Sequence, residues 1–350
     1  MQGPKEYVES LDRDRGDGRV EGAGASVEHN NNGALLHFAG DVDGARRAYE
    51  KALAEDPANP SALNNLAFLL AQEGRFAEAL PLYERSLVLD PDGVTARVNL
   101  GNARVATGDL DGGVADLSAV LSVDHTNALA WDGLATALML AGDLERAEAA
   151  WRSALRVSPT EARFAVALGT VVAAQHRLDE ACALLRTAIE LDPASARAWG
   201  QLGIALLARS DLGSAEDALR RSLELAPEDN GVRRHFVTVL VARGKNAEAV
   251  LELRRLLALR PDMTDVRVDL AVVLLGSGDP AAALVELEAA RSADPDDSRA
   301  AYYAGAALHL TGERDRAVEL MQQVAESSDE LHAGRAREFL DGVLASAAAE

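Results

Sequence analysis

The apolar positions of this chain follow a helical spacing that is interrupted at regular intervals. In residues 196–229 the apolar side chains fall on one helical face up to Leu206, and the period breaks at Ser210. A second helical face then runs to Pro227, where proline cannot continue the helix. Neither helix can bury its apolar face alone, so the pattern predicts helical hairpins that stack on one another.

The same pattern returns every 34 residues. Nine such units fill residues 26–331 without an insertion. Residues 1–25 lack apolar periodicity and are expected to be disordered. Residues 332–350 carry an apolar face that includes Phe339, which predicts a helix and tail capping the last unit. The prolines that recur at this interval are Pro57, Pro91, Pro159, Pro193, Pro227, Pro261 and Pro295, with His125 in the one gap.

These units resemble the tetratricopeptide repeat (TPR), whose signature places a large aromatic residue, Leu-Gly, a small residue and Pro at fixed positions. One unit matches with Trp199, Leu202, Gly203, Ala215 and Pro227. The resemblance implies an all-α fold, a right-handed TPR solenoid of helix-turn-helix repeats with a C-terminal capping helix. It also implies that the protein binds other proteins or peptides.

Charge and motifs exclude several other functions. The 56 acidic residues outnumber the 35 basic ones, giving a net charge of −21, which disfavours nucleic acids and anionic membranes as partners. Cys182 is the only cysteine, and no phosphate-binding loop, zinc or nucleophile motif occurs. We therefore expect no enzyme activity, no catalytic or metal-binding residues and no cofactor. The N-terminus lacks a signal-peptide core, and a cytoplasmic location is expected. The oligomeric state is left open.

Asparagines of the first three units are candidate peptide-binding residues. In TPR proteins the first helix of each unit lines a concave groove, and a carboxamide there can both donate to and accept from a peptide backbone. Asn31, Asn65 and Asn99 lie 34 residues apart, which predicts a row resembling the asparagine ladder of peptide O-GlcNAc transferase TPR regions. Alternatively, asparagine is merely a tolerated polar residue. The candidates are Asn30, Asn31, Asn64, Asn65, Asn99 and Asn102, flanked by Phe68 and Gln72.

The middle units differ in charge from the rest. Residues 162–263 carry 14 basic and 13 acidic residues, and their inward-facing arginines are suited to holding an acidic segment by bidentate pairing. Neutralisation of nearby acids such as Glu161 is the competing interpretation. The inward-facing candidates of this region are Arg163, Arg197, Gln201, Arg234 and His235.

The last unit offers an aromatic candidate, Tyr303, beside Tyr302. Tyrosine is enriched at binding hot spots, and packing against the capping helix is the alternative. The sequence thus indicates a non-catalytic scaffold or adaptor that binds an extended peptide or a partner helix in its groove. A substrate-recruiting subunit of a multi-chain enzyme, or of a secretion or assembly machine, is the alternative function.

Overall fold

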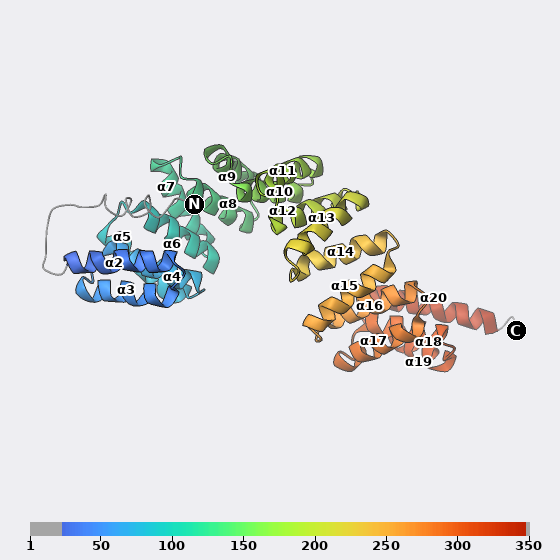
Figure 1. Cartoon of the computed structure of the whole chain (residues 1–350). Helices are drawn as coiled ribbons and strands as arrows, with labels where there is room; N and C mark the ends of the chain where they lie inside the picture. The colour runs from blue at the N-terminus through green and yellow to red at the C-terminus, as the bar shows by residue number, and fades with distance from the viewer. Residues whose placement is uncertain (1–22, 348–350) are drawn as a thin grey trace. The chain divides into compact units, whose positions relative to one another are not determined.

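The computed structural model describes residues 23–347, and within them every regular element is a helix (Figure 1). The chain divides into two compact parts, Met1–Arg177 and Leu178–Glu350. The helices of the N-terminal part are α2 (Ala23–Phe38), α3 (Val42–Glu55), α4 (Pro60–Gln72), α5 (Phe76–Leu89), α6 (Val94–Thr107), α7 (Leu110–Val123), α8 (Ala128–Leu140), α9 (Leu144–Val157) and α10 (Ala162–Ala174).

The C-terminal part continues the same alternation. Its helices are α11 (Leu178–Leu191), α12 (Ala196–Ala208), α13 (Leu212–Leu225), α14 (Asn230–Ala242), α15 (Asn246–Leu259), α16 (Thr264–Gly276), α17 (Pro280–Ala293), α18 (Ser298–Leu310), α19 (Arg314–Ala325) and α20 (Glu330–Ala347). We call the even-numbered helices from α2 to α18 the first helices of their repeats, and the odd-numbered ones the second helices. The expected all-helical repeat architecture is confirmed.

Both ends of the array differ slightly from the expected boundaries. Helix α2 begins at Ala23, so residues 23–25 already belong to the first helix, whereas most of the segment expected to be disordered lies outside the described residues. Helix α20 begins at Glu330 and packs against α18 and α19. The rings of His309 on α18 and Phe339 on α20 lie 5.1 Å apart, which fixes α20 over the last repeat.

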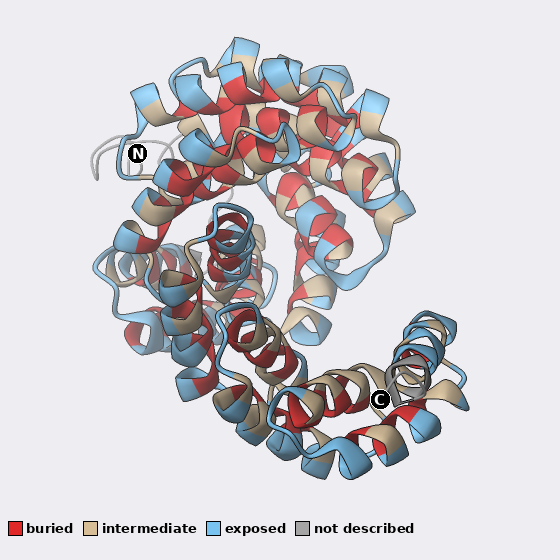
Figure 2. Ribbon diagram, turned by 90° about the vertical axis from the view of Figure 1, so that its right-hand side faces the viewer, coloured by how far each residue is buried: buried red, intermediate tan, exposed pale blue. Residues whose placement is uncertain are grey.

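Helix packing within each part buries the apolar faces that the sequence pattern predicts. Figure 2 shows the buried residues on the sides of helices that face their neighbours and the exposed residues on the outer sides. In several repeats the second helix presents one large side chain to a glycine of the first helix, as Tyr49 does to Gly33 and Leu219 to Gly203. A Cβ at Gly203 would lie 2.5 Å from Leu219 Cγ, so the absence of a side chain is what permits this close approach.

A hydrogen bond from the fourth residue of a repeat secures the junction with the preceding repeat. The indole N–H of Trp199 donates to the Pro193 carbonyl at 3.0 Å, and Trp131 donates to the His125 carbonyl at 2.9 Å. Arginine makes the same bond in three other repeats, where the donors are Arg97, Arg233 and Arg267 and the acceptors are the carbonyls of Pro91, Pro227 and Pro261.

Each of these arginines also faces an acid on the second helix of its own repeat. Arg267 pairs with Glu286 at 2.9 Å and Arg233 with Glu252 at 2.5 Å, while Arg97 lies 3.9 Å from Asp116. Where the fourth residue is Trp131 or Trp199, the acid is replaced by alanine, at Ala150 and Ala218. Two side-chain combinations, Arg with an acid and Trp with Ala, therefore occupy equivalent places.

The turns inside the repeats use the left-handed backbone conformation. Seven glycines adopt it, with φ between 72° and 90°, and His176 and Ser210 adopt it with φ of 61° and 65°. Residues with a Cβ pay a steric cost in this conformation, so two turns are strained relative to the others. The glycines are Gly40, Gly74, Gly108, Gly142, Gly244, Gly278 and Gly312.

Replacing Ser210 with glycine is expected to raise the free energy of unfolding by about 0.5–1 kcal/mol, because relief of the left-handed strain exceeds the added chain entropy. Ser214→Gly is the matched control, since Ser214 lies in the first turn of α13, and it is expected to lower stability by about 0.5 kcal/mol. Equilibrium denaturation compares the two variants. Destabilisation by Ser210→Gly would contradict the assignment of strain to this turn.

Candidate functional site

Asparagine side chains of three successive first helices form one hydrogen-bonded chain. Asn99 Nδ2 on α6 donates to Asn64 Oδ1 on α4 at 3.0 Å. Asn65 Nδ2 on α4 donates to Asn30 Oδ1 on α2 at 3.0 Å. Asn64 Nδ2 donates to Asn65 Oδ1 at 3.3 Å, which joins the two bonds. Asn30 is buried and the other three are half-buried, so the chain leads from the interior of α2 to the surface of α6.

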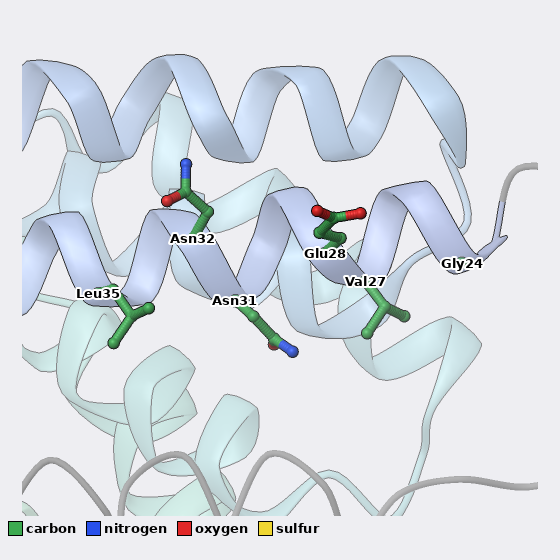
Figure 3. Close-up of a pocket in the computed structure, with 6 residues that line it drawn as sticks. All are labelled: Gly24, Val27, Glu28, Asn31, Asn32 and Leu35. Atoms are coloured by element: carbon green, nitrogen blue, oxygen red, sulfur yellow. The ribbon is translucent and has the colours of Figure 1, made fainter.

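This arrangement differs from the expected row of Asn31, Asn65 and Asn99. The bonded amides across neighbouring helices lie 35 residues apart, so the fifth residue of one repeat bonds to the sixth residue of the next. Asn31 lies instead on the same side of α2 as Val27 and Leu35 (Figure 3), where these residues line a shallow depression of about 420 Å³. One residue along a helix turns the side chain by about 100°, which separates Asn31 from the amide chain.

Asn102 extends the polar surface from α6 towards α8. A Cβ at Gly133 would lie 2.1 Å from Asn102 Oδ1, so the Asn102 side chain lies directly over Gly133. Gly133 stands 34 residues after Asn99, and the space that a side chain would need there is filled by Asn102 of the preceding repeat. We call Asn30, Asn64, Asn65, Asn99 and Asn102 the amide face.

Phe68 and Gln72 lie on α4 beside the amide face. They follow Asn64 at intervals of four residues, so the three side chains share one side of the helix. Gln72 Oε1 lies 3.0 Å from His37 Nε2, and the rings of His37 and Phe68 lie 5.9 Å apart. Phe68 remains 38% exposed. The contact with His37 was missed by the sequence analysis, although His37 and Gln72 also lie 35 residues apart.

Two of the three candidate arginines of the middle repeats, Arg163 and Arg234, form ion pairs. Arg163 pairs with Asp132 at 2.8 Å and lies over the Phe164 ring, 4.4 Å from its centroid. Arg234 pairs with Asp265 at 2.7 Å. These contacts agree with charge neutralisation, the competing interpretation. Arg197 and His235 are exposed on their helices, and Gln201 is half-buried on α12.

Tyr303 lies in an aromatic cluster at the capping helix. Its ring lies 5.3 Å from Tyr302 and 6.3 Å from His332 on α20. The His332 ring is buried and contacts Asp329 through a 2.6 Å hydrogen bond, which lowers the pKa of the Asp329 carboxyl. The tyrosine pair thus packs against the capping helix, as the alternative interpretation requires.

Cys182 and the potential metal ligands are the described residues whose chemistry the structure bears on. Cys182 is fully buried, and burial raises the pKa of its thiol, so the side chain is unsuited to act as a nucleophile. Residues 23–347 contain no group of three or more His, Cys, Asp or Glu side chains positioned for a metal ion. None of the described helices has the length and apolarity needed to cross a membrane.

Family models agree with the repeat architecture. Three models described as tetratricopeptide repeat match this chain at residues 35–94, 70–135, 196–229, 240–302 and 274–338. A further model, described as the middle TPR-like domain of cilia and flagella-associated protein 70, matches residues 118–208. No curated protein matches the chain.

Solved structures share the fold at low sequence identity. A Cut9–Hcn1 hetero-tetramer of the APC/C matches with a TM-score of 0.57 and 17% identity over 87% of this chain and 59% of that one. Pseudomonas aeruginosa PilF matches with a TM-score of 0.55 and 14% identity over 64% of this chain and 100% of PilF. A TPR protein from Parabacteroides merdae has a TM-score of 0.51 and 15% identity over 71% and 98%. These likenesses concern the fold alone.

Proposed function

The chain belongs to the tetratricopeptide repeat family, whose members generally mediate protein–protein interactions, and we propose that it is a non-catalytic scaffold that binds a peptide segment on its amide face. The observation that supports this proposal is the amide chain from α2 to α6. Hydrogen bonds between its members hold the carboxamides in defined orientations before a ligand arrives. Such preorganisation lowers the entropic cost of binding.

The amide face retains hydrogen-bonding capacity for a ligand. A carboxamide has two N–H donors and two acceptor lone pairs, and the bonds between the asparagines use one donor each of Asn64, Asn65 and Asn99. The remaining donors and acceptors suit a peptide backbone, which carries both groups at each residue. Phe68 adds an apolar surface beside them, so recognition combines backbone capture with one apolar contact.

The bond partners decide which variant tests the proposal. Replacing Asn65 and Asn99 together would remove two hydrogen-bond donors. Buried Asn30 would lose the donor Asn65, and half-buried Asn64 would lose the donor Asn99. Asn64→Ala with Asn99→Ala removes both ends of one hydrogen bond and takes a donor only from Asn65, which is half-buried and bonded at 3.3 Å, so the loss of stability is expected to be small. A random peptide library selected on the full chain supplies the ligand, and fluorescence anisotropy measures the affinity of the enriched peptides.

The double variant is expected to bind the selected peptides about tenfold to one-hundredfold more weakly, because two or more hydrogen bonds to the backbone are lost. Asn246→Ala is the matched control, since Asn246 begins α15 in the C-terminal part, and its affinity should equal that of the wild type. Denaturation curves verify that both proteins remain folded. Unchanged affinity in the double variant would exclude the amide face as the binding surface.

A further inference from the structure

A cleft of about 380 Å³ lies between α14 and α16 in the C-terminal part. Its floor is apolar and well ordered by packing, since Leu253 and Val266 are 2% and 1% exposed. Its mouth is open, because Val241 on the rim is 42% exposed. The complete lining consists of Arg234, Val237, Thr238, Val241, Leu253, Val266, Asp269, Val272 and Val273. This volume lies within the range of small binding sites, about 300–1,000 Å³.

One residue that lines the cleft departs from the repeat pattern. Val237 occupies a position at which the other eight repeats have only glycine or alanine. At Gly203 the missing side chain lets α12 approach Leu219 of α13 closely, whereas Val237 places a β-branched side chain at the equivalent point of α14. Val237 lines the cleft together with Leu253 of α15.

Opposite charges stand on the two sides of the cleft. Arg234 on the α14 side pairs with Asp265 at 2.7 Å, and Asp269 on the α16 side pairs with Arg299 at 2.5 Å. All four side chains are between 38% and 53% exposed. Exposed ion pairs contribute little to stability, so a ligand can replace either partner at small cost.

We propose that this cleft binds a partner peptide in which one large aliphatic side chain lies between an acidic and a basic residue. The aliphatic side chain enters the cleft and covers Leu253 and Val266. The acidic residue pairs with Arg234 and the basic residue with Asp269. This site is separate from the amide face and lies in the C-terminal part alone. The experiment below therefore tests it independently of the function proposed above.

The test uses a defined probe and the full chain with labelled valine methyl groups. The probe is an acetylated, amidated peptide of sequence Gly-Ser-Glu-Gly-Leu-Gly-Lys-Ser-Gly, titrated by NMR. Binding of the probe is expected to shift the methyl resonances of five valines of the protein, Val237, Val241, Val266, Val272 and Val273. Replacing the peptide leucine with serine should weaken binding about tenfold, the loss of one buried aliphatic side chain. Peptides with two acidic or two basic residues should bind about threefold more weakly.

Matched protein variants locate the site. Val241→Glu places a charge on the rim and is expected to weaken binding about tenfold. Val285→Glu makes the same change at a 66% exposed position of α17 outside the cleft, and should leave binding unchanged. Equal binding of the leucine and serine peptides, shifts confined to other valines, or equal effects of the two variants would overturn the proposal. Equal binding of the three charge patterns would overturn its charged component.

Discussion

Glu252→Ala is expected to lower the free energy of unfolding by about 3 kcal/mol, because it leaves a buried guanidinium without its counter-charge. The side chains of Arg233 and Glu252 are only 6% and 11% exposed. Arg233 Nε is already buried without a hydrogen-bond partner among the described residues. The carboxylate of Glu252 therefore supplies most of the compensation that this arginine receives, together with the Pro227 carbonyl.

The repeats that contain Trp131 and Trp199 indicate how the stability lost in Glu252→Ala can be recovered. Trp131 with Ala150, and Trp199 with Ala218, occupy the places that Arg233 and Glu252 occupy in their own repeat. Adding Arg233→Trp to Glu252→Ala removes the unpaired charge and restores an N–H donor for the Pro227 carbonyl. The double variant is expected to be within about 1 kcal/mol of the wild type, since apolar replacement of a buried ion pair is often neutral.

Equilibrium denaturation of the full chain, monitored by circular dichroism, measures the free energy of unfolding of the single and the double variant. Arg255→Ala is the control, because it also removes an ion-pair partner of the Glu252 carboxylate. Arg255 is 66% exposed, so this variant should lower the free energy of unfolding by less than about 1 kcal/mol. A double variant no more stable than Glu252→Ala alone would show that the Trp–Ala and Arg–acid combinations are not interchangeable.

Gly203→Ala is expected to destabilise the protein by about 2 kcal/mol, although alanine is the better helix former. The new Cβ would lie 2.5 Å from Leu219 Cγ and 3.1 Å from the Leu219 backbone nitrogen. The side chain can rotate, but the backbone of α13 can yield only if the two helices separate. The steric cost therefore exceeds the gain of about 1 kcal/mol in helix propensity.

Gly213→Ala is the matched control because nothing lies within 4 Å of a Cβ at Gly213. This variant is expected to be about 0.5 kcal/mol more stable than the wild type. Opposite shifts of the denaturation midpoint for the two glycines are the expected result. A stabilising shift for both variants would mean that α12 and α13 separate easily, and that the close approach at Gly203 contributes little to the fold.

The sequence was sufficient to predict the repeats, the helix pairs and the turns, because each rests on a local rule that recurs. Gly142 is required by its positive φ, and Pro227 lies two residues beyond the end of α13, where proline is common. Such signals add together over nine copies. The start of α2 at Ala23 lay outside this reasoning, since residues before the first full repeat have no earlier copy for comparison.

The candidate site was only partly accessible from sequence. The asparagines were identified, but a 34-residue period points to equivalent positions, whereas the hydrogen bonds between repeats join asparagines 35 residues apart. The role of the middle arginines in holding an acidic segment stays a prediction, and their ion-pair partners were missed for a different reason. Arg163 and Arg234 meet acids 31 residues away, a spacing that joins the first helices of adjacent repeats and that a search for charge pairs could have used.

The two kinds of contact made by the fourth residue of a repeat bear on how this array can be copied and rearranged in evolution. In the hydrogen bond to the preceding repeat the acceptor is a backbone carbonyl, which every residue possesses. The His125 carbonyl therefore accepts from Trp131 just as the Pro193 carbonyl accepts from Trp199. The contact that depends on side-chain identity stays inside one repeat. Recombination near the linker therefore transfers matched pairs, whereas a crossover between Arg233 and Glu252 would separate them. Duplication in whole units is the route by which this chain can lengthen without losing stability.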